Sequence, residues 1–391
     1  MKNLLRNIER HLHRLCLVPS RHIGSPGAAA AAAYIEETFR SYGYPQTVQE
    51  PFPATGWRFG SMIFADLDEG SRDVPGVLPC FFSRSAEVTD TPFWLTEAEL
   101  EKISGEQVAG RLCVVELLRG GLDVRGRNGV AEDLDALGAA AAVFIGGTDS
   151  VNSTLQRSPN LKTLGTVSAG KSGSLHLARN RNHRYFLKID AETFPHTGHN
   201  VVAVRPGTGP FRAVFGAHYD AAPLTQGACD NASGVACLLE AARLLREELP
   251  EWTFEFVAFD AEEYCIHGDL PGGSEAYVTS HPDRKWAFFT DFDCVGTLLG
   301  EEAVCVGRSE KLPAFDTIYP VKPIRYAGDE RNFDRLEVPS LWFTSFPRFQ
   351  EFHTPADTID TLDIGKIARC VSYSLDVTRQ ICLKLQKGKN S

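Results

Sequence analysis

The pattern of hydrophobic positions predicts an α/β fold. From about residue 185 onward, short apolar runs that end in turn residues alternate with stretches of helical periodicity. Within Gly234–Leu245, for example, Leu238 and Ala242 fall on one face of a helix. The short runs are apolar almost throughout, which is typical of strands that are buried on both faces. The alternation therefore predicts a sheet that is covered by helices on both sides.

Turn residues predict where several of these elements begin and end. Pro26 suits the first turn of a helix over Ala28–Arg40. Residues 362–385 have the periodicity of an amphipathic helix. The runs 185–192 and 200–207 are each followed by turn residues, so we expect two separate strands there.

The stretch 61–189 differs from the rest of the chain. It contains short strand-like pieces, many glycines and polar loops. Residues 110–121, followed by residues 130–147, have the pattern of a strand, a helix and a second strand. We therefore predict a discontinuous main domain over residues 1–60 and 190–391, with 61–189 as a smaller α/β insertion domain.

Composition and charge exclude some classes of partner. Fifty acidic residues against forty basic ones give a formal charge of −10, whereas nucleic acids and anionic membranes attract basic surfaces. No apolar run reaches the roughly 20 residues of a membrane-spanning helix, and the first residues lack the apolar stretch of a secretory signal. The ten cysteines include no C-x-x-C pair, which is typical of reduced thiols. We expect a cytoplasmic protein without nucleic-acid or membrane partners.

Ionisable residues gather where the predicted strands end. His218 and Asp220 follow an apolar strand, and because residues two apart share a face of a strand, their side chains can approach each other. Glu262 and Glu263 follow another strand, and adjacent buried acids repel unless a proton or a cation lies between them. The remaining candidates are Asp230, Asp260, Asp293 and His353.

Each candidate also has an ordinary structural explanation, and Asp230, for instance, suits the N-cap of a helix. Together, however, they place two histidines and several carboxylates at strand ends, which is where open α/β sheets build their sites. Nitrogen and oxygen ligands in this ratio suit zinc, with manganese or cobalt as substitutes.

The local sequences around these residues resemble the zinc-dependent exopeptidase family that includes di-zinc aminopeptidases, glutaminyl cyclases and glutamate carboxypeptidases. The matching pieces cover most of residues 20–45 and 198–365, and they are SRHIGSPG, NVVAVRPGTG, GAHYD, GACDNASGVACLLEAARLL, FEFVAFDAEE, GGSEAYV, DFDCVG and FHTPADTID. The resemblance implies a three-layer helix–sheet–helix fold with a mixed, mainly parallel central sheet. It also implies an aminopeptidase-like exopeptidase that acts on a peptide or an amino-acid derivative.

The resemblance assigns five of the candidates to two co-catalytic zinc ions. His218 and Asp293 would hold one ion, and Glu263 and His353 would hold the other. Asp230 would bridge the two ions, and its carboxylate would offset the repulsion between them.

The resemblance also assigns roles to residues that bind no metal. Glu262 would be the general base, which takes a proton from water and passes it to the leaving amine. Asp220 would orient the metal-bound ring of His218. The peptide bond between Asp230 and Asn231 would be cis.

The chain departs from the family pattern at three places. Phe352 stands where many family members have a tyrosine, and Gly328-Asp329-Glu330 replaces Ser-Asp-His. The loop after Glu263 is long and contains His267, which could reach the substrate or lie on the surface. The insertion faintly resembles a protease-associated domain, and both a lid and a passive insert remain open.

Two other functions remain as alternatives. FPRFQEFHT is similar to the segment before the last histidine of glutaminyl cyclases, which are acyltransferases with one zinc ion, whereas the segment 230–234 follows the aminopeptidase pattern. A binding module without catalytic activity would have lost metal ligands, and all five ligand positions are present here. The sequence assigns no substrate-binding residues and no oligomeric state.

Overall fold

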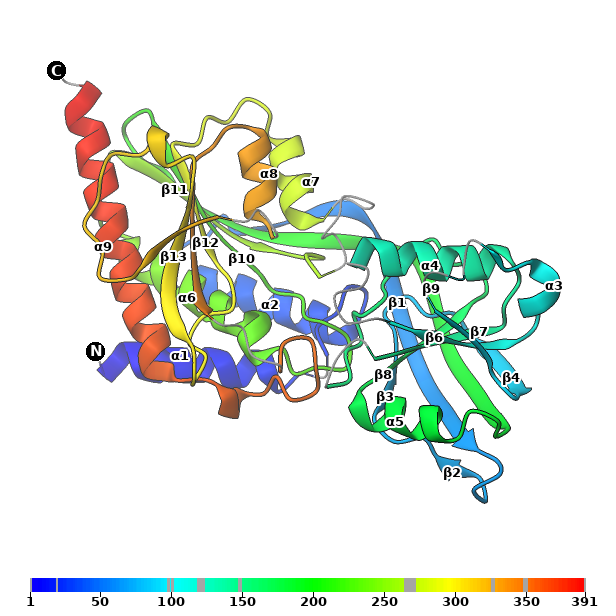
Figure 1. Ribbon diagram of the computed structural model, residues 1–391. Coiled ribbons are helices and arrows are strands. Elements are labelled where there is room, and N and C mark those ends of the chain that lie inside the picture. The colour runs from blue at the N-terminus through cyan, green and yellow to red at the C-terminus, as the bar shows by residue number, and fades with distance from the viewer. Residues whose placement is uncertain are drawn as a thin grey trace.

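The chain forms a main α/β part and a smaller lobe, which lies at the right in Figure 1. The computed structural model describes residues 2–18, 20–96, 99, 102–117, 124–146, 150–263, 272–324, 328–346 and 351–389.

A ten-stranded sheet forms the centre of the main part, in the order β14-β13-β15-β12-β10-β11-β9-β1-β2, with β4 paired to β9. Its strands are β1 (Val48–Asp66), β2 (Arg72–Asp73), β4 (Ala86–Asp90), β9 (Tyr185–Arg205), β10 (Phe211–His218), β11 (Trp252–Phe259), β12 (Phe288–Phe292), β13 (Glu301–Gly307), β14 (Val321–Pro323) and β15 (Ser340–Phe346). The neighbours β11, β10, β12 and β15 run parallel, whereas β9, β1 and β2 pair antiparallel. The carboxyl ends of four central strands therefore meet at one edge of the sheet.

Helices cover both faces of this sheet, as the apolar pattern predicts (Figure 1). One face carries α1 (Lys2–Cys16), α2 (Pro26–Ser41), α6 (Ser233–Leu245) and α9 (Ile364–Lys389), and the other carries α7 (Gly273–Ser280) and α8 (Glu330–Arg335). Along β10, Ala213 and Phe215 pack in the first of these cores, whereas Val214 packs in the second. The predicted three-layer fold is confirmed, and its parallel pairs lie mainly at the centre of the sheet.

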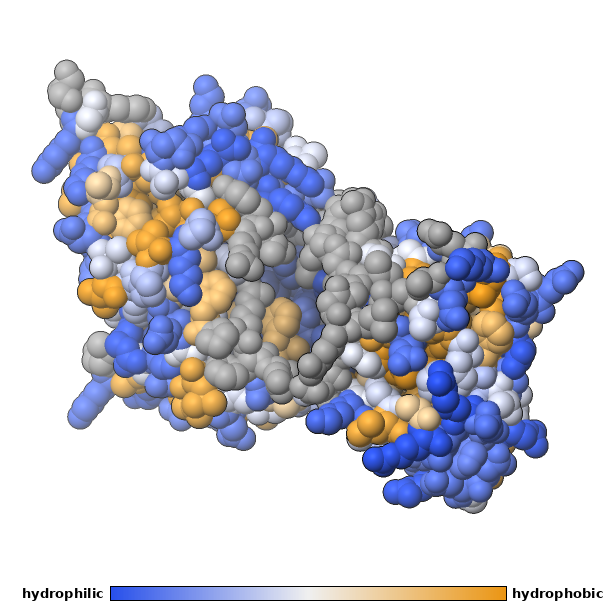
Figure 2. Space-filling view, in the orientation of Figure 1, coloured by the Kyte–Doolittle hydropathy of each residue, from blue (hydrophilic) through white to orange (hydrophobic). Residues whose placement is uncertain are grey.

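The smaller lobe has its own five-stranded sheet, in the order β3-β8-β7-β6-β5. Its elements are β3 (Val77–Pro79), β5 (Phe93–Thr96), α3 (Gly105–Val108), β6 (Leu112–Glu116), α4 (Val124–Ala136), β7 (Ala141–Ile145), β8 (Gly165–Ala169) and α5 (Lys171–Arg179). The sequence β6–α4–β7 is the predicted strand, helix and strand, and β6 and β7 pair in parallel. The far end of the lobe around β2 is covered by hydrophilic residues (Figure 2).

Two long strands connect the lobe to the main sheet. The prediction of separate strands at residues 185–192 and 200–207 is wrong, because β9 runs without interruption over 21 residues. Its polar middle stays extended because β1 pairs with it along almost its whole length, from Val48 opposite Val202 to Asp66 opposite Tyr185. The predicted domain boundaries fall inside these two strands, and that division stays a prediction.

Among the described residues, no helix combines the length and the apolar character that a membrane span requires. The nine described cysteines are free thiols, and most of them are buried.

A buried carboxylate links three helices on one face of the sheet. Glu240 of α6 is fully buried and accepts hydrogen bonds from Asn7 at 3.1 Å, from Tyr42 at 3.1 Å and from Arg243. Nε2 of His11 lies 3.5 Å from the same carboxylate. Burial alone would raise the pKa of Glu240, but the hydrogen bonds from His11 and Arg243 lower it to about 2. The charged form is therefore the one that the fold stabilises.

We expect Glu240→Gln to lower the free energy of unfolding at pH 7 by about 1.5–3 kcal/mol, the usual contribution of hydrogen bonds to a charged group. Because folding lowers the pKa of Glu240 from 4.5 to about 2, this stability is present above pH 4.5 and is lost as the pH falls toward 2. Urea unfolding between pH 3 and 7 checks this, with the exposed Glu247→Gln as control. Equal pH dependence in the wild type and Glu240→Gln would contradict it.

Candidate metal centre

The residues predicted from the sequence converge at the carboxyl edge of the main sheet. His218 is the last residue of β10, Glu262 and Glu263 follow β11, and Asp293 follows β12. Parallel strands place these ends side by side, because β10 lies between β11 and β12. Two further segments then add Asp230 and His353. The first is the turn η2 (Ala228–Ala232), which precedes α6, and the second is the loop before η4 (Ile359–Thr361).

Two groups of ligand atoms share the carboxylate of Asp230. In one group, Nε2 of His218 lies 3.1 Å from Oδ1 of Asp230 and 3.5 Å from Oδ1 of Asp293. In the other group, Nε2 of His353 lies 3.0 Å from Oδ2 of Asp230 and 3.0 Å from Oε2 of Glu263. Each group offers three ligand atoms within 4.8 Å of one another. Asp230 therefore faces a separate imidazole with each of its oxygens.

The buried acids of this centre repel one another, and this repulsion shifts the pKa values of the residues around them. Burial and the charge of Asp230 raise the pKa of Glu263, and burial with the neighbouring Glu263 also holds the pKa of Glu262 well above its usual range. Burial would lower the pKa of His353, but Glu263 and Asp230 outweigh it and raise that pKa to about 9. Within the described residues, Oε1 of Glu263 is buried without a hydrogen-bond partner. An orphaned carboxylate oxygen among nitrogen and oxygen ligands fits a divalent cation.

The backbone around Asp230 is held by the residue that follows it. The Asp230–Asn231 peptide bond is cis, as the resemblance implies. The Asn231 side chain donates to the carbonyl of Phe292 at 2.8 Å and accepts from the amides of Gly234 at 2.9 Å and Cys294 at 3.3 Å. Asn231 thereby ties the Asp230 turn to the strand end that carries Asp293.

Asp220 contacts three parts of the centre at once. Its Oδ1 lies 3.3 Å from Nδ1 of His218. The same carboxylate accepts the backbone amides of Glu262 at 3.0 Å and Glu263 at 3.1 Å. The sequence predicts the contact with His218, whereas the two amide contacts arise only because β10 and β11 are neighbours.

Two residues outside the predicted set fix the loops of the centre. The fully buried guanidinium of Arg21 donates to the carbonyls of Tyr219 at 2.9 Å and Gly227 at 2.7 Å. Asp357 accepts the amides of Cys229 at 2.8 Å and Asp230 at 3.1 Å. Both residues lie inside the family-like motifs, but nothing in their local sequence indicates what they contact.

The departures from the family pattern have different structural outcomes. Phe352 stacks on the ring of His353, with the centroids 3.5 Å apart. Asp329 and Glu330 are buried, and the amide of Gly328 donates to the Glu330 carboxylate at 3.1 Å. His267 lies outside the described residues.

A cavity of about 210 Å³ lies directly beside this centre. Its walls include the chain neighbours of three candidate ligands, namely Cys229, Cys294 and Phe352, together with Leu298 and Leu299. The wall residues are Cys229, Cys294, Thr297, Leu298, Leu299, Glu351, Phe352, Asp357, Asp360 and Thr361. The cavity therefore combines a mainly apolar lining with a position next to the residues that flank three candidate ligands.

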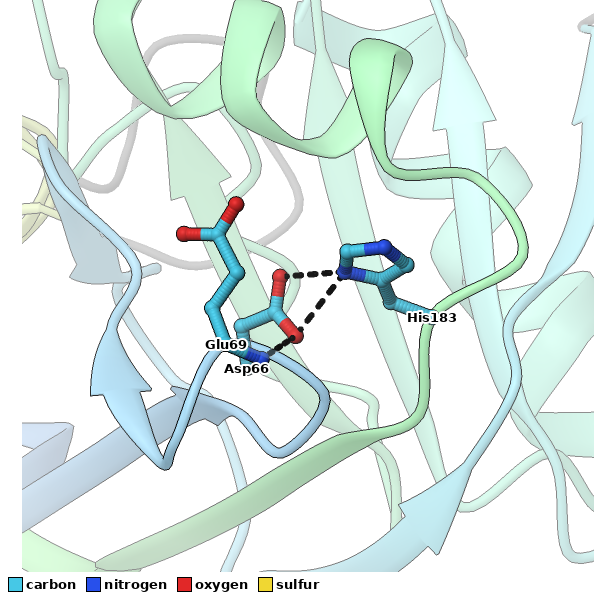
Figure 3. Close-up of side chains that lie close together, drawn as sticks. All are labelled: Asp66, Glu69 and His183. Atoms are coloured by element: carbon cyan, nitrogen blue, oxygen red, sulfur yellow. Dashed lines mark hydrogen bonds and ion pairs between the residues drawn. The ribbon is translucent and has the colours of Figure 1, made fainter.

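A third cluster of potential ligands lies in the lobe and has a structural explanation. Asp66, Glu69 and His183 come together where β1 ends, and the Asp66 carboxylate faces Nδ1 of His183 (Figure 3). Asp66 also receives Nε2 of His176 at 3.0 Å and the amides of Asp68 at 3.1 Å and Glu69 at 3.2 Å. These donors satisfy both of its oxygens, so the cluster closes a turn without a cation.

The chain is similar to several known proteins. Residues 200–378 match the family model described as Peptidase family M28. The uncharacterized protein YfbL of Escherichia coli is 28% identical over 236 residues, which are 47% of this chain and 72% of that protein. The aminopeptidase YwaD of Bacillus subtilis is 30% identical over 143 residues, so the match spans 35% of this chain and only 30% of YwaD. The solved structure of a zinc aminopeptidase from Bacillus subtilis aligns over 96% of this chain and 95% of its own length, with a TM-score of 0.76 at 19% identity, and shows the same fold.

We expect zinc binding to metal-stripped protein to release protons, because the raised pKa of His353, about 9, keeps its ring protonated at neutral pH and a ligand nitrogen must lose its proton. The apparent zinc affinity should therefore rise as the pH increases from 6 toward 9. Calorimetric titrations in buffers of different ionisation enthalpy measure the number of protons released. An affinity that does not change over this range would contradict the protonated state of the centre.

Proposed function

We propose that the chain is a metal-dependent aminopeptidase, which removes residues from the amino end of peptides, because residues 200–378 match the model of Peptidase family M28. The observation that carries the proposal is the Asp230 carboxylate, which faces His218 with one oxygen and His353 with the other. A carboxylate shared in this way suits two cations that act together on one substrate.

The proposed metal content is two zinc ions, for which manganese or cobalt could substitute. His218, Asp230 and Asp293 would hold the first ion, and Asp230, Glu263 and His353 would hold the second. The imidazole and carboxylate donors of both groups support zinc as the metal.

The proposed mechanism uses the protein groups that surround the two ligand sets. The chemistry that two bound divalent ions supply is Lewis acidity, which polarises the scissile carbonyl and lowers the pKa of a water molecule. Glu262, whose Oε2 lies 4.0 Å from Nε2 of His218, is the proposed general base. It would take the proton of the attacking water and deliver it to the leaving amine. Asp220 would keep the His218 ring oriented, because it contacts the nitrogen on the far side of that ring.

The cavity beside the centre supports a preference for apolar side chains at the cleaved residue. Leu298, Leu299 and Phe352 contribute hydrocarbon surface, and the cavity volume of about 210 Å³ accommodates a side chain of the size of leucine. The peptide would then lie with its first side chain in the cavity and its first carbonyl at the ligand groups. A cytoplasmic location is part of the same proposal and is supported by the nine free cysteines.

We expect the zinc-saturated protein to retain two tightly bound ions per chain and to hydrolyse leucyl-anilide. Metal analysis after exhaustive dialysis gives the stoichiometry, and a glutaminyl substrate assayed in parallel reports cyclisation. One retained ion together with cyclisation would instead favour a glutaminyl cyclase-like acyltransferase. Two retained ions with neither activity would favour a binding module.

We expect substitution of the adjacent acids Glu262 and Glu263 to have different effects, the first on turnover and the second on metal retention. Glu262→Gln removes the proposed proton carrier and should lower kcat at least about 100-fold while both ions stay bound. Glu263→Gln removes a proposed ligand and should weaken metal retention. Steady-state kinetics combined with metal analysis separates the two, with the exposed Glu301→Gln of β13 as control. Near-normal turnover of Glu262→Gln would refute its role.

A further inference from the structure

A segment of the smaller lobe reaches into the metal centre of the main part. Residues 152–158, the bridging segment, lie between β7 and β8 in the sequence, and most of their side chains are buried. Two of these side chains, those of Thr154 and Arg157, contact residues of the second ligand group.

The first contact fixes the ring of His353. Nδ1 of His353 lies 2.7 Å from Oγ1 of Thr154. That Oγ1 lies 2.9 Å from Oδ1 of Asn152, which also accepts the amide hydrogen of Thr154 at 2.7 Å. Because an amide oxygen can only accept, the Thr154 hydroxyl donates to Asn152 and accepts from Nδ1–H of His353. The proton stays on Nδ1, so Nε2 is the nitrogen that remains for a cation.

The second contact holds the backbone of Glu263 and places a positive charge beside its carboxylate. Arg157 is almost fully buried, with 3% of its side chain exposed, and donates to the backbone carbonyl of Glu263. Its Nη1 also lies 3.7 Å from Oε2 of the same residue. A guanidinium in this place holds the Glu263 backbone and offsets part of the negative charge that Glu263 shares with Asp230.

Hydrogen bonds from both parts of the molecule hold the bridging segment. On the lobe side, Arg127 of α4 donates to the carbonyl of Leu155 at 2.6 Å, and the Asn128 side chain accepts the amide of Arg157 at 2.9 Å. On the main side, the Ser153 hydroxyl donates to the carbonyl of Pro223 at 2.7 Å. The segment therefore has little freedom to move away from the centre.

We propose that Thr154 and Arg157 are positioning residues for the second metal ion, and that the lobe is thereby a structural part of the metal centre. The inference rests on the proposed function only in taking Glu263 and His353 as ligands. Groups that orient a metal-bound imidazole commonly change metal affinity 10–100-fold when they are removed. The contacts of both residues are to His353 and Glu263, which belong to the second ligand group, so the effect should fall on that ion.

The test compares Thr154→Val with Thr154→Ser in the full-length chain. Valine keeps the volume but cannot accept from His353, whereas serine keeps the hydroxyl. Chelator competition against zinc should show one unchanged ion and one ion bound about 10–100-fold more weakly in Thr154→Val. Thr154→Ser should bind both ions like the wild type. Thr163→Val, which removes a lobe hydroxyl that donates to Asp135, is the matched control.

Arg157→Lys provides a second, independent variant, because it keeps the charge but loses the planar donor group. It should also weaken one ion selectively. Wild-type affinity for both ions in Thr154→Val, or an equal loss of both ions, would overturn the inference. Metal affinity is measured without substrate, so failure of the proposed peptidase activity in the wild type would be seen separately. Selective loss of one ion would support the inference in either case.

Discussion

The concentration of negative charge at one edge of the main sheet is the constraint on which the rest of the centre depends. Asp230 and Glu263 are buried, and Asp293 is partly buried, beside the two buried imidazoles of His218 and His353. Carboxylates this close and this buried repel one another unless protons or cations neutralise them. The raised pKa values of Glu262, Glu263 and His353 all express that constraint. Divalent cations held by the two ligand groups that share Asp230 would neutralise this charge.

These charged side chains stay close together only if the loops that carry them are held in place. Arg21, Asp220, Asn231 and Asp357 fix the loops through backbone groups, and each connects segments that are far apart in the sequence. Such contacts keep the ligand atoms in place because a backbone amide or carbonyl cannot rotate away as a side chain can. The centre is therefore determined as much by buried hydrogen bonds to the backbone as by the ligands themselves.

The smaller lobe also contributes buried side chains that hold residues of the centre in place. Strands β1 and β9 pair from the main sheet into the lobe, with one shift of register between Phe59 and Ser61, so long paired strands connect the two parts. Hydrogen bonds to both parts hold the bridging segment against Glu263 and His353. A lid that merely covered the cleft would not need buried side chains at the ligands, whereas Thr154 and Arg157 are both buried there.

The sequence by itself determined the class of fold, the helices over Ala28–Arg40 and Gly234–Leu245, and the candidate ligands, because apolar periodicity, capping residues and strand-end motifs are local signals. It did not predict the continuous strand β9, since the pairing that extends its polar middle comes from β1. It also did not predict Arg21, Asp357, Thr154 or Arg157 as parts of the centre. Thr154 and His353, for example, are 199 positions apart, and no local pattern links them. Only the tertiary structure decided these contacts, because a hydrogen bond depends on which surfaces the fold brings together.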